Sequence, residues 1–158
     1  MTEVQVIYVG NIKEKYYSDA LDEFKKRLSM FCRFVETEIK EEKTDENESN
    51  ASILKCLEKE GDKILAAIPK NCYKIALCVE GLQEDSQQFS KIISENSASQ
   101  PIIFVIGSSH GLSEKVKAAC DKRLSFSKMT LPHRLMRVVL YEQIYRAMTI
   151  LAGKKYHK

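Results

Sequence analysis

Two short segments of the sequence combine glycine, hydroxyl and apolar residues in a way that suits the binding of a small organic ligand. The first, IGSSHGLS at residues 106–113, places two glycines and three serines directly after an apolar run. Glycine lets the backbone approach a ligand closely, so that main-chain N–H groups can act as donors. The segment lacks the Gly-Lys-Ser/Thr of a Walker A loop and the G-x-G-x-x-G dinucleotide pattern. It indicates a nucleotide-like ligand, although a tight turn that needs glycine only for its geometry accounts for it equally well.

The second segment, FSKMTLPH at residues 126–133, is apolar apart from Ser127, Lys128 and Thr130. Pro132 suits the start of the helix that follows. An apolar loop near the ends of strands can form the floor of a pocket for a flat ring. A connection that only packs against the core is the alternative interpretation.

The stretch from His133 to Ala152 is predicted to form a helix that is both apolar and basic. When residues are placed at intervals of about 100°, one arc gathers those that we expect to be buried against the sheet and a second subunit: Met136, Val139, Leu140, Gln143, Ile144, Ala147, Ile150 and Leu151. The opposite arc holds Arg134, Arg137, Tyr141 and Tyr145, with Glu142 and Arg146 at its flank. We expect this arc to face an anionic or base-bearing partner, although tyrosines at such spacing more often serve in packing.

The charge distribution is uneven along the chain. Residues 121–158 carry nine Lys and Arg against two acids, whereas residues 36–48 carry seven acids against two lysines. Such polarity suggests a polyanionic partner near the C-terminal end. A solvated surface with uneven charge is the alternative interpretation.

The composition excludes several classes of protein. A chain of 158 residues with 44% hydrophobic and 30% charged residues is typical of a single globular domain and too apolar for disorder. We find no secretion signal at the N-terminus and no run of about 18 apolar residues that could span a membrane, so we expect a cytoplasmic protein. The five cysteines contain no C-x-x-C pair and the three histidines show no ligand spacing, so we expect reduced thiols and no metal.

Strands and helices are predicted to alternate along the chain. Short β-branched or apolar runs predict strands at residues 4–9, 33–39, 73–79, 102–107 and 123–127, the second of them nearer a sheet edge. Helical periodicity predicts helices at residues 13–30, 53–68, 85–95, 113–119 and 133–152. We expect Gly61 to interrupt the second helix, Pro69 to stop it, and Glu80-Gly81 to turn the chain after the third strand. The alternation indicates an α/β domain with a mainly parallel sheet.

In such open sheets, ligands bind beyond the carboxyl ends of the strands. Three loops satisfy this condition: those after Val79, Gly107 and Phe126. They include both segments described above. The strand-end rule therefore predicts one ligand site to which all three loops contribute.

Several of these segments together resemble a known family. FVIGSSHGLS and LSFSKMTLPHRLMRVVLYEQIYRAMTILAGKKYHK, and more weakly VQVIYVGNIKEKYYSDALDEFKKRL and LEKEGDKILAAI, are similar to the bacterial RlmH family of SPOUT methyltransferases. The resemblance implies a single SPOUT domain over residues 1–158, with a C-terminal trefoil knot and a homodimeric assembly. It also implies S-adenosyl-L-methionine as cofactor and N3 of a pseudouridine in 23S rRNA of the assembled ribosome as the target.

The resemblance also assigns residues. Matched by position, cofactor contacts fall on Leu77, Gly107, Phe126, Ser127, Lys128, Met129, Thr130 and Leu131. The basic helix and the terminal Tyr-His-Lys give RNA-binding candidates, namely Arg134, Arg137, Arg146, Tyr156, His157 and Lys158. Of these, His157 and Arg137 are candidates for substrate positioning and catalysis, and the general base stays unassigned. Where the family commonly has a second glycine, this chain has Ser108.

A function of another class uses the same features. A non-catalytic RNA- or ribosome-binding factor would share the basic helix but would not need a cofactor pocket. A nucleotide-binding hydrolase is disfavoured, because the sequence has neither a phosphate-loop lysine nor a pair of a nucleophile and a base.

Overall fold

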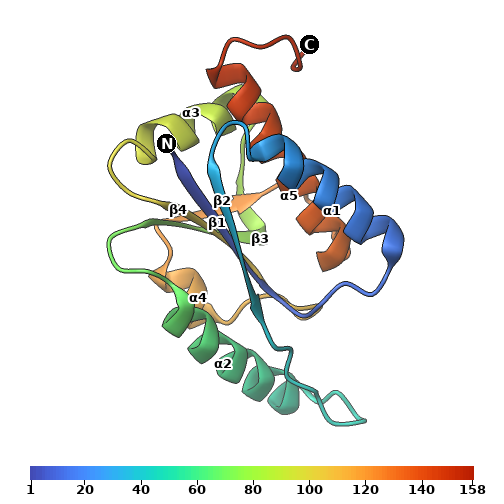
Figure 1. Cartoon of the computed structure of the whole chain (residues 1–158). Coiled ribbons are helices and arrows are strands. Elements are labelled where there is room, and N and C mark those ends of the chain that lie inside the picture. The colour runs from blue at the N-terminus through green and yellow to red at the C-terminus, as the bar shows by residue number, and fades with distance from the viewer.

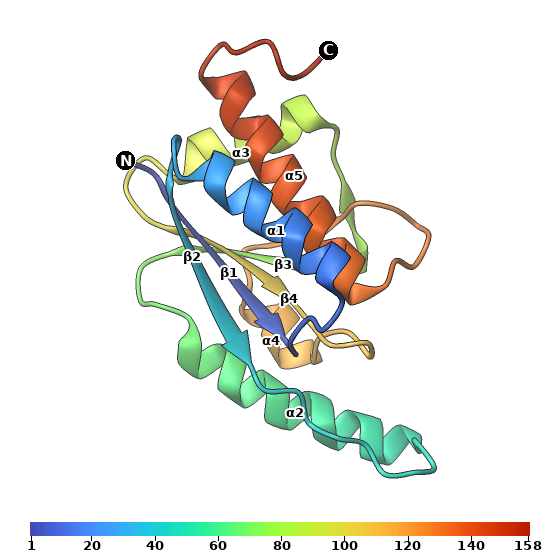
Figure 2. The same ribbon diagram turned by 45° about the vertical axis from the view of Figure 1, so that its right-hand side comes forward.

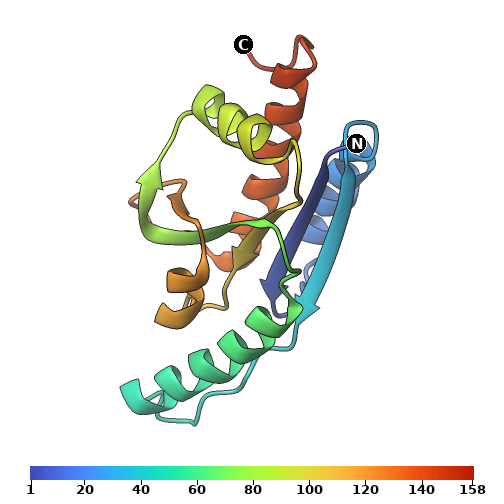
Figure 3. The same cartoon turned by 90° about the vertical axis from the view of Figure 1, so that its left-hand side faces the viewer.

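A five-stranded sheet lies between two groups of helices in the computed structural model, which describes residues 1–158 (Figure 1). Helices α1, α3 and α5 cover one face of the sheet, and α2 and α4 cover the other (Figure 3). The elements in chain order are β1 (Glu3–Val9), α1 (Lys15–Leu28), β2 (Arg33–Ile39), α2 (Asn50–Ala67), β3 (Tyr73–Gln83), α3 (Ser86–Asn96), β4 (Ile102–Ile106), α4 (Glu114–Ala119), β5 (Lys122–Ser125) and α5 (His133–Leu151).

The sheet has the strand order β2-β1-β4-β3-β5, and all four of its strand pairs are parallel. The prediction of an α/β domain with a parallel sheet is thus confirmed, as is the edge position of β2. All five residues of β4 are buried. A central parallel strand is covered on both faces, which explains why this strand reads as an unbroken apolar run.

Alternate residues of each strand enter two separate hydrophobic cores. On the side of α1, α3 and α5 lie Val4 and Phe104, while Ile7 and Val105 point toward α2 and α4. This follows from the two-residue period of a strand, which sends successive side chains to opposite faces. No helix combines the length and the apolar character that crossing a bilayer requires.

Strand β3 is longer than predicted, and the expected turn at Glu80-Gly81 is wrong. The strand continues to Gln83, with a bulge across which both Leu77 and Leu82 pair with Leu124 of β5. Gly81 lies so close to β5 that a Cβ there would be 2.6 Å from the carbonyl carbon of Leu124. Glycine therefore serves the close approach of two backbones here and does not end the strand.

Helix α2 is continuous through Gly61, so the predicted interruption is also wrong. A Cβ on Gly61 would lie 2.5 Å from Oγ of Ser113, so the glycine permits close packing against the segment that begins α4. The helix is capped at its start by Ser49, whose side chain accepts a hydrogen bond from the N–H of Ser52. It ends before Pro69, as predicted.

Helix α5 lies between α1 and α3 (Figure 2), and its buried face agrees only in part with the predicted arc, at Leu140, Ile144 and Ala147. The buried residues are Arg137, Leu140, Tyr141, Ile144, Ala147, Met148 and Thr149, whereas Leu151 is 46% exposed. Because α5 has neighbours on both sides, the arc that contains Arg137 and Tyr141 is not free to face a partner. The expected separation into an apolar buried arc and a polar exposed one is therefore wrong for these two residues.

The buried polar groups of α5 are satisfied inside the protein. Arg137 donates hydrogen bonds to Glu36 of β2 and, over 3.1 Å, to the hydroxyl of Tyr141. Its guanidinium also lies 3.4 Å from the ring centroid of Tyr8. Burial favours the protonated acid, but hydrogen bonds from Tyr141, Arg137 and Lys25 outweigh it and lower the pKa of Glu36. The arginine thus joins α5 to the first two strands.

Candidate functional site

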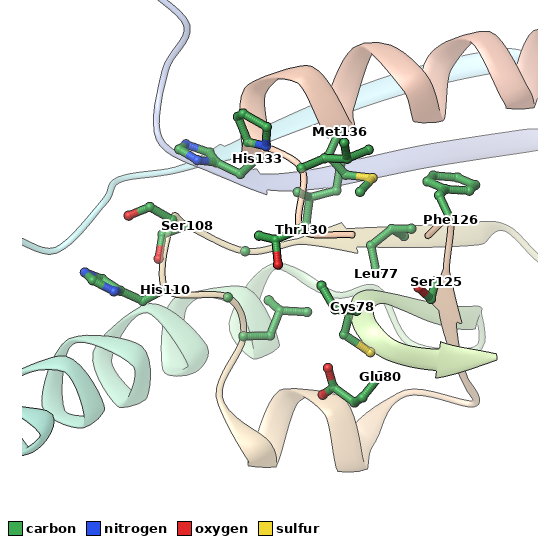
Figure 4. A pocket seen from close by; sticks show the side chains of 18 of the residues that line it. Leu77, Cys78, Glu80, Ser108, His110, Ser125, Phe126, Thr130, His133 and Met136 are labelled. Carbon is green, nitrogen blue, oxygen red and sulfur yellow. The ribbon is translucent and has the colours of Figure 1, made fainter. Parts of the chain in front are cut away.

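A cavity of about 620 Å³ opens at the carboxyl ends of β3, β4 and β5 (Figure 4). These strands are neighbours in the sheet, and parallel strands end at the same edge, so the segments that follow them meet there. Residues 77–80 at the bulge of β3, residues from the loop after Ile106 and residues from the loop after Ser125 line the cavity. The three segments predicted from strand ends therefore do enclose one pocket.

Six of the eight residues expected to contact a cofactor line this cavity: Leu77, Gly107, Phe126, Ser127, Thr130 and Leu131. Lys128 and Met129 do not line it, and Met129 is 77% exposed. The hydroxyl of Ser127 accepts a 2.9 Å hydrogen bond from the N–H of Met129, which closes a tight turn at this point. The side chains of Lys128 and Met129 belong to that turn, outside the cavity wall.

The glycine-containing loop has a geometry that other residues would disturb. A Cβ on Gly107 would lie 2.1 Å from the carbonyl oxygen of Gly111, and Gly111 itself has a φ of +86°. The N–H of Gly111 donates a 2.9 Å hydrogen bond to the carbonyl of Ser108, which closes the turn 108–111. The segment is thus a tight turn that also lines the cavity, and the binding of a nucleotide-like ligand by it stays a prediction.

The cavity floor is largely apolar. Leu77, Ile106, Leu124, Phe126 and Met136 contribute side chains from three strand ends and from the first turn of α5. The ring of Phe126 packs edge to face on Phe89, with 6.2 Å between the centroids. This surface suits a flat ring, while backbone groups and the hydroxyls on the surrounding loops can supply hydrogen bonds.

Charged and titratable groups also line the cavity, and the sequence analysis did not identify them. Glu80 lies on the β3 bulge, and Nζ of Lys117 on α4 is 2.5 Å from its Oε1. This hydrogen bond is the main cause that lowers the pKa of Glu80. His133 lines the cavity as well, and burial lowers its pKa. The bulge was not predicted because Glu80-Gly81 was interpreted as a turn. No feature of the sequence around Lys117 indicates that this residue lies at the cavity.

The tail residues form a second cluster, on the last turns of α5. Arg146 donates a 3.0 Å hydrogen bond from Nε to Glu142, and the hydroxyl of Tyr156 donates one of 3.2 Å to the same carboxylate. Nη1 of Arg146 lies 3.4 Å from Nδ1 of His157. The structure therefore brings together three of the predicted RNA-binding residues, while Lys158 stays exposed.

This cluster is far from the cavity within one chain. His133 and Met136, in the first turn of α5, line the cavity, whereas the C-terminus lies beyond the other end of the helix (Figures 1 and 2). Met136 at the cavity and Arg146 in the tail cluster are separated by about 15 Å along the helix, at 1.5 Å per residue. None of Tyr156, His157 and Lys158 lines the cavity of its own chain.

The remaining two predicted RNA-binding residues lie on the first turns of α5. Arg134 donates a 2.7 Å hydrogen bond to Glu14, and both side chains are about one-third exposed. Arg137 is 7% exposed and paired with Glu36, so the prediction that it faces outward is wrong. The side chains of His, Cys, Asp and Glu form no cluster of three or more that could hold a metal ion.

Comparison with known proteins supports a specific family. A family model described as "Predicted SPOUT methyltransferase" matches residues 2–157. A protein of Caldicellulosiruptor bescii named ribosomal RNA large subunit methyltransferase H is 49% identical over 98% of this chain and 99% of its own length. A protein of the same name from Streptococcus uberis is 46% identical over 99% of each chain.

A solved structure confirms the fold. A probable methyltransferase from Bordetella pertussis superposes with a TM-score of 0.59 at 12% identity, over 93% of this chain and 95% of that one. Such low identity supports the architecture alone. The family match and the full-length relatives show that the chain belongs to the SPOUT methyltransferases and, within them, to the ribosomal RNA large subunit methyltransferase H family.

Proposed function

We propose that the protein is an S-adenosylmethionine-dependent methyltransferase that modifies N3 of a pseudouridine in 23S rRNA of the assembled ribosome. The observation that carries this proposal is the cavity, because it gathers six of the eight residues expected to hold the cofactor. Its relatives are named as methyltransferases of the large ribosomal RNA, over nearly the whole chain length. Ribosomal RNA as substrate agrees with the cytoplasmic location expected from the sequence.

The cavity fits S-adenosylmethionine in size and chemistry. Its volume of about 620 Å³ falls within the range typical of small-molecule sites. Leu77, Phe126 and Leu131 offer an apolar surface for the adenine ring, and the turn 108–111 offers backbone groups for the polar parts. Glu80 is the one carboxylate on the cavity wall, and it is paired with Lys117, which lines the cavity as well.

When bound, the cofactor supplies an activated methyl group on a sulfonium. The task of the protein is alignment, because methyl transfer is an in-line displacement and good positioning supplies roughly 7–11 kcal/mol. The imide N3–H of the base must also lose its proton, which calls for a general base or a group that stabilises the anion. Arg146 and His157, which lie together in the tail cluster, are suited to removing this proton or to stabilising the anion.

We also propose that the enzyme acts as a homodimer with a knotted C-terminal segment. The reason for the dimer is that Met136 at the cavity and Arg146 in the tail cluster are separated by about 15 Å along α5. In this proposal the tail acts on a base at the cavity of a second copy. A cavity from one chain and a tail from its partner would then form one reaction site. Exposed Lys158 and the neighbouring Arg146 would bring positive charge to the RNA at that point.

Two measurements test the proposal. Calorimetry with S-adenosylmethionine should show binding to the unaltered protein. Ribosomes from cells that lack the protein should gain one methyl group per 23S rRNA when treated with the protein and cofactor, and mass mapping should place it on a pseudouridine. If the protein binds ribosomes but neither binds the cofactor nor transfers a methyl group, it is a non-catalytic RNA-binding factor.

A further inference from the structure

The buried carboxylate of Glu60 is hydrogen-bonded to the turn 108–111, which lines one side of the cavity. Glu60 of α2 is 3% exposed and Ser108 is 5% exposed. The hydroxyl of Ser108 donates a 3.0 Å hydrogen bond to Oε1 of Glu60. The other carboxylate oxygen accepts a 3.0 Å hydrogen bond from the backbone N–H of Glu42. Glu60 therefore links the cavity turn to the segment that leads into α2.

The next residue of α2 supports the other end of the same loop. Gly61 lies against Ser113, whose Oγ would be 2.5 Å from a Cβ at position 61. Ser113 in turn caps α4, because its hydroxyl accepts a 3.3 Å hydrogen bond from the N–H of Val116. Two consecutive residues of α2 thus support the first and the last part of the loop 107–113.

A carboxylate in this position is costly, which argues for a specific role. No lysine or arginine forms an ion pair with Glu60, and its only partners are two hydrogen-bond donors. Burial is the main cause that raises its pKa. An apolar side chain of similar size would avoid that cost, so the carboxylate is better explained by what it positions than by stability alone.

The internal bonds of the turn do not fix where it lies. The hydrogen bond between Gly111 and Ser108 closes the turn on itself, and the glycines give it its shape. The Ser108 side chain makes the buried hydrogen bond that joins the turn to α2. The other contact of the turn on that side is between His110 and the more exposed Glu48, over 3.7 Å. Without the hydrogen bond from Ser108, we expect the turn to keep its shape but to occupy several positions relative to Leu77 and Thr130, which line the cavity with it.

We propose that Glu60 is a positioning residue for the cofactor, which acts through Ser108 to hold the turn 108–111 in the position that binds S-adenosylmethionine. The inference rests on the proposed function and adds a determinant of cofactor affinity outside the cavity wall. If loss of the hydrogen bond between Ser108 and Glu60 reduces the fraction of molecules with a correctly placed turn to about one-tenth, the apparent affinity for S-adenosylmethionine falls about tenfold. The methyl-transfer step itself is unchanged once the cofactor is bound.

Calorimetry with S-adenosylmethionine, together with steady-state kinetics, tests this proposal. Ser108→Ala and Glu60→Ala should each bind the cofactor about tenfold more weakly. The KM for the cofactor should rise accordingly, while kcat at saturating cofactor stays within about twofold. The double variant should bind no more weakly than Glu60→Ala, because both changes break one link. Ser108→Ala keeps the bond between Glu60 and Glu42, so it decides the question if Glu60→Ala does not fold.

A conservative variant and a distant control separate positioning from stability. Glu60→Gln should restore wild-type affinity, since its oxygen can accept from Glu42 and its amide can donate to Ser108. Thr37→Ala is the control, because it removes the 2.7 Å partner of Gln5, a mostly buried amide between β1 and β2. It should lower the unfolding midpoint and leave cofactor affinity unchanged.

Three outcomes would overturn the inference. Wild-type affinity in both Ser108→Ala and Glu60→Ala would show that the link does not position the turn. Equal weakening by Thr37→Ala would show a general effect of stability. If the unaltered protein itself does not bind S-adenosylmethionine, the proposed function is wrong and the inference falls with it.

Discussion

The two ends of helix α5 differ in how their polar groups are arranged. At the N-terminal end, His133 and Met136 border a cavity whose walls come from three segments of one chain. In the C-terminal half, Arg146 and Tyr156 contact Glu142, and His157 lies against Arg146, in a cluster that contributes nothing to the cavity wall. One end has the shape of a ligand site, and the other has the charge of a nucleic-acid contact.

The proposed function divides the reaction between these two regions. In it, the cofactor is bound by residues that one chain brings together at the cavity. RNA is contacted by the tail cluster, about 15 Å from Met136 along α5. Changes at the two ends should therefore affect different steps, and each prediction below tests that separation.

Removal of Tyr156 to Lys158 should have the largest effect on turnover. The truncated protein should lose at least about 100-fold in methyl transfer, because even a small misplacement of reacting groups costs that much. Its affinity for S-adenosylmethionine should stay within about twofold, since no tail residue lines the cavity. Calorimetry and methyl incorporation into ribosomes measure the two quantities, and unchanged turnover would remove the tail from the reaction.

Mixed dimers extend this test to the proposed division between subunits. A chain with a truncated tail would be combined with a chain that carries Gly107→Ala in the cavity loop. If the tail acts on the partner's cavity, the mixture should recover part of the activity that each variant lacks alone. Absence of any recovery, with heterodimers present, would contradict action between subunits.

Gly107→Ala alone should affect the cavity and not the tail cluster. A Cβ there would lie 2.1 Å from the carbonyl oxygen of Gly111, and backbone atoms cannot yield as a flexible side chain can. We expect cofactor affinity to fall roughly 10- to 100-fold, which corresponds to the usual cost of overpacking. Gly153→Ala is the control beyond the C-terminal end of α5: nothing lies within 4 Å of the added carbon, and the φ of +66° makes the change a strain outside the cavity. Its cofactor affinity should equal that of the wild type.

Arg137→Ala tests whether the buried arginine on the first turns of α5 serves stability, separately from the cavity and the tail cluster. The change leaves Glu36 without its buried partner, and loss of one member of such a pair costs about 3 kcal/mol in the free energy of unfolding. Denaturant titration measures this loss, which Glu36→Gln should partly relieve in the double variant. A stable Arg137→Ala protein with weakened RNA binding would instead support the original expectation of an RNA contact.

The sequence predicted the cavity well because the relevant rule is local. Parallel strands carry their own apolar signature, and their carboxyl ends meet at one edge whatever the order of the strands. The loops after β3, β4 and β5 could therefore be selected without knowing that these strands are neighbours. The bulge in β3 was missed, since Gly81 reads as a turn until the approach of β5 is known.

The polar partners could not be predicted in the same way. Arg137 and Glu36 are 101 residues apart in the chain, and Lys117 and Glu80 are 37 apart. Periodicity assigns a residue to one arc of a helix, but it does not say which arcs other elements of the fold will cover. Arg137 is buried where the pattern predicted an exposed face, because it lies against Tyr8 of β1 and Glu36 of β2.

The smallest predicted effect concerns stability at acidic pH, through the Glu36 carboxylate that Arg137 and Tyr141 of α5 contact. The pKa of Glu36 is lowered from a reference value of 4.5, since hydrogen bonds from Tyr141, Arg137 and Lys25 outweigh burial. An acid with a lowered folded-state pKa contributes stability above its unfolded pKa and loses it as the pH falls through the folded value. Unfolding measured between neutral pH and pH values below 4.5 should therefore show a loss that Glu36→Gln reduces. Cofactor affinity at neutral pH should stay unchanged in that variant, because Glu36 takes no part in the cavity wall. An equal acid response in both proteins would show that the carboxylate is not held by these three donors, and the middle of the helix would then be less tightly fixed than its contacts indicate.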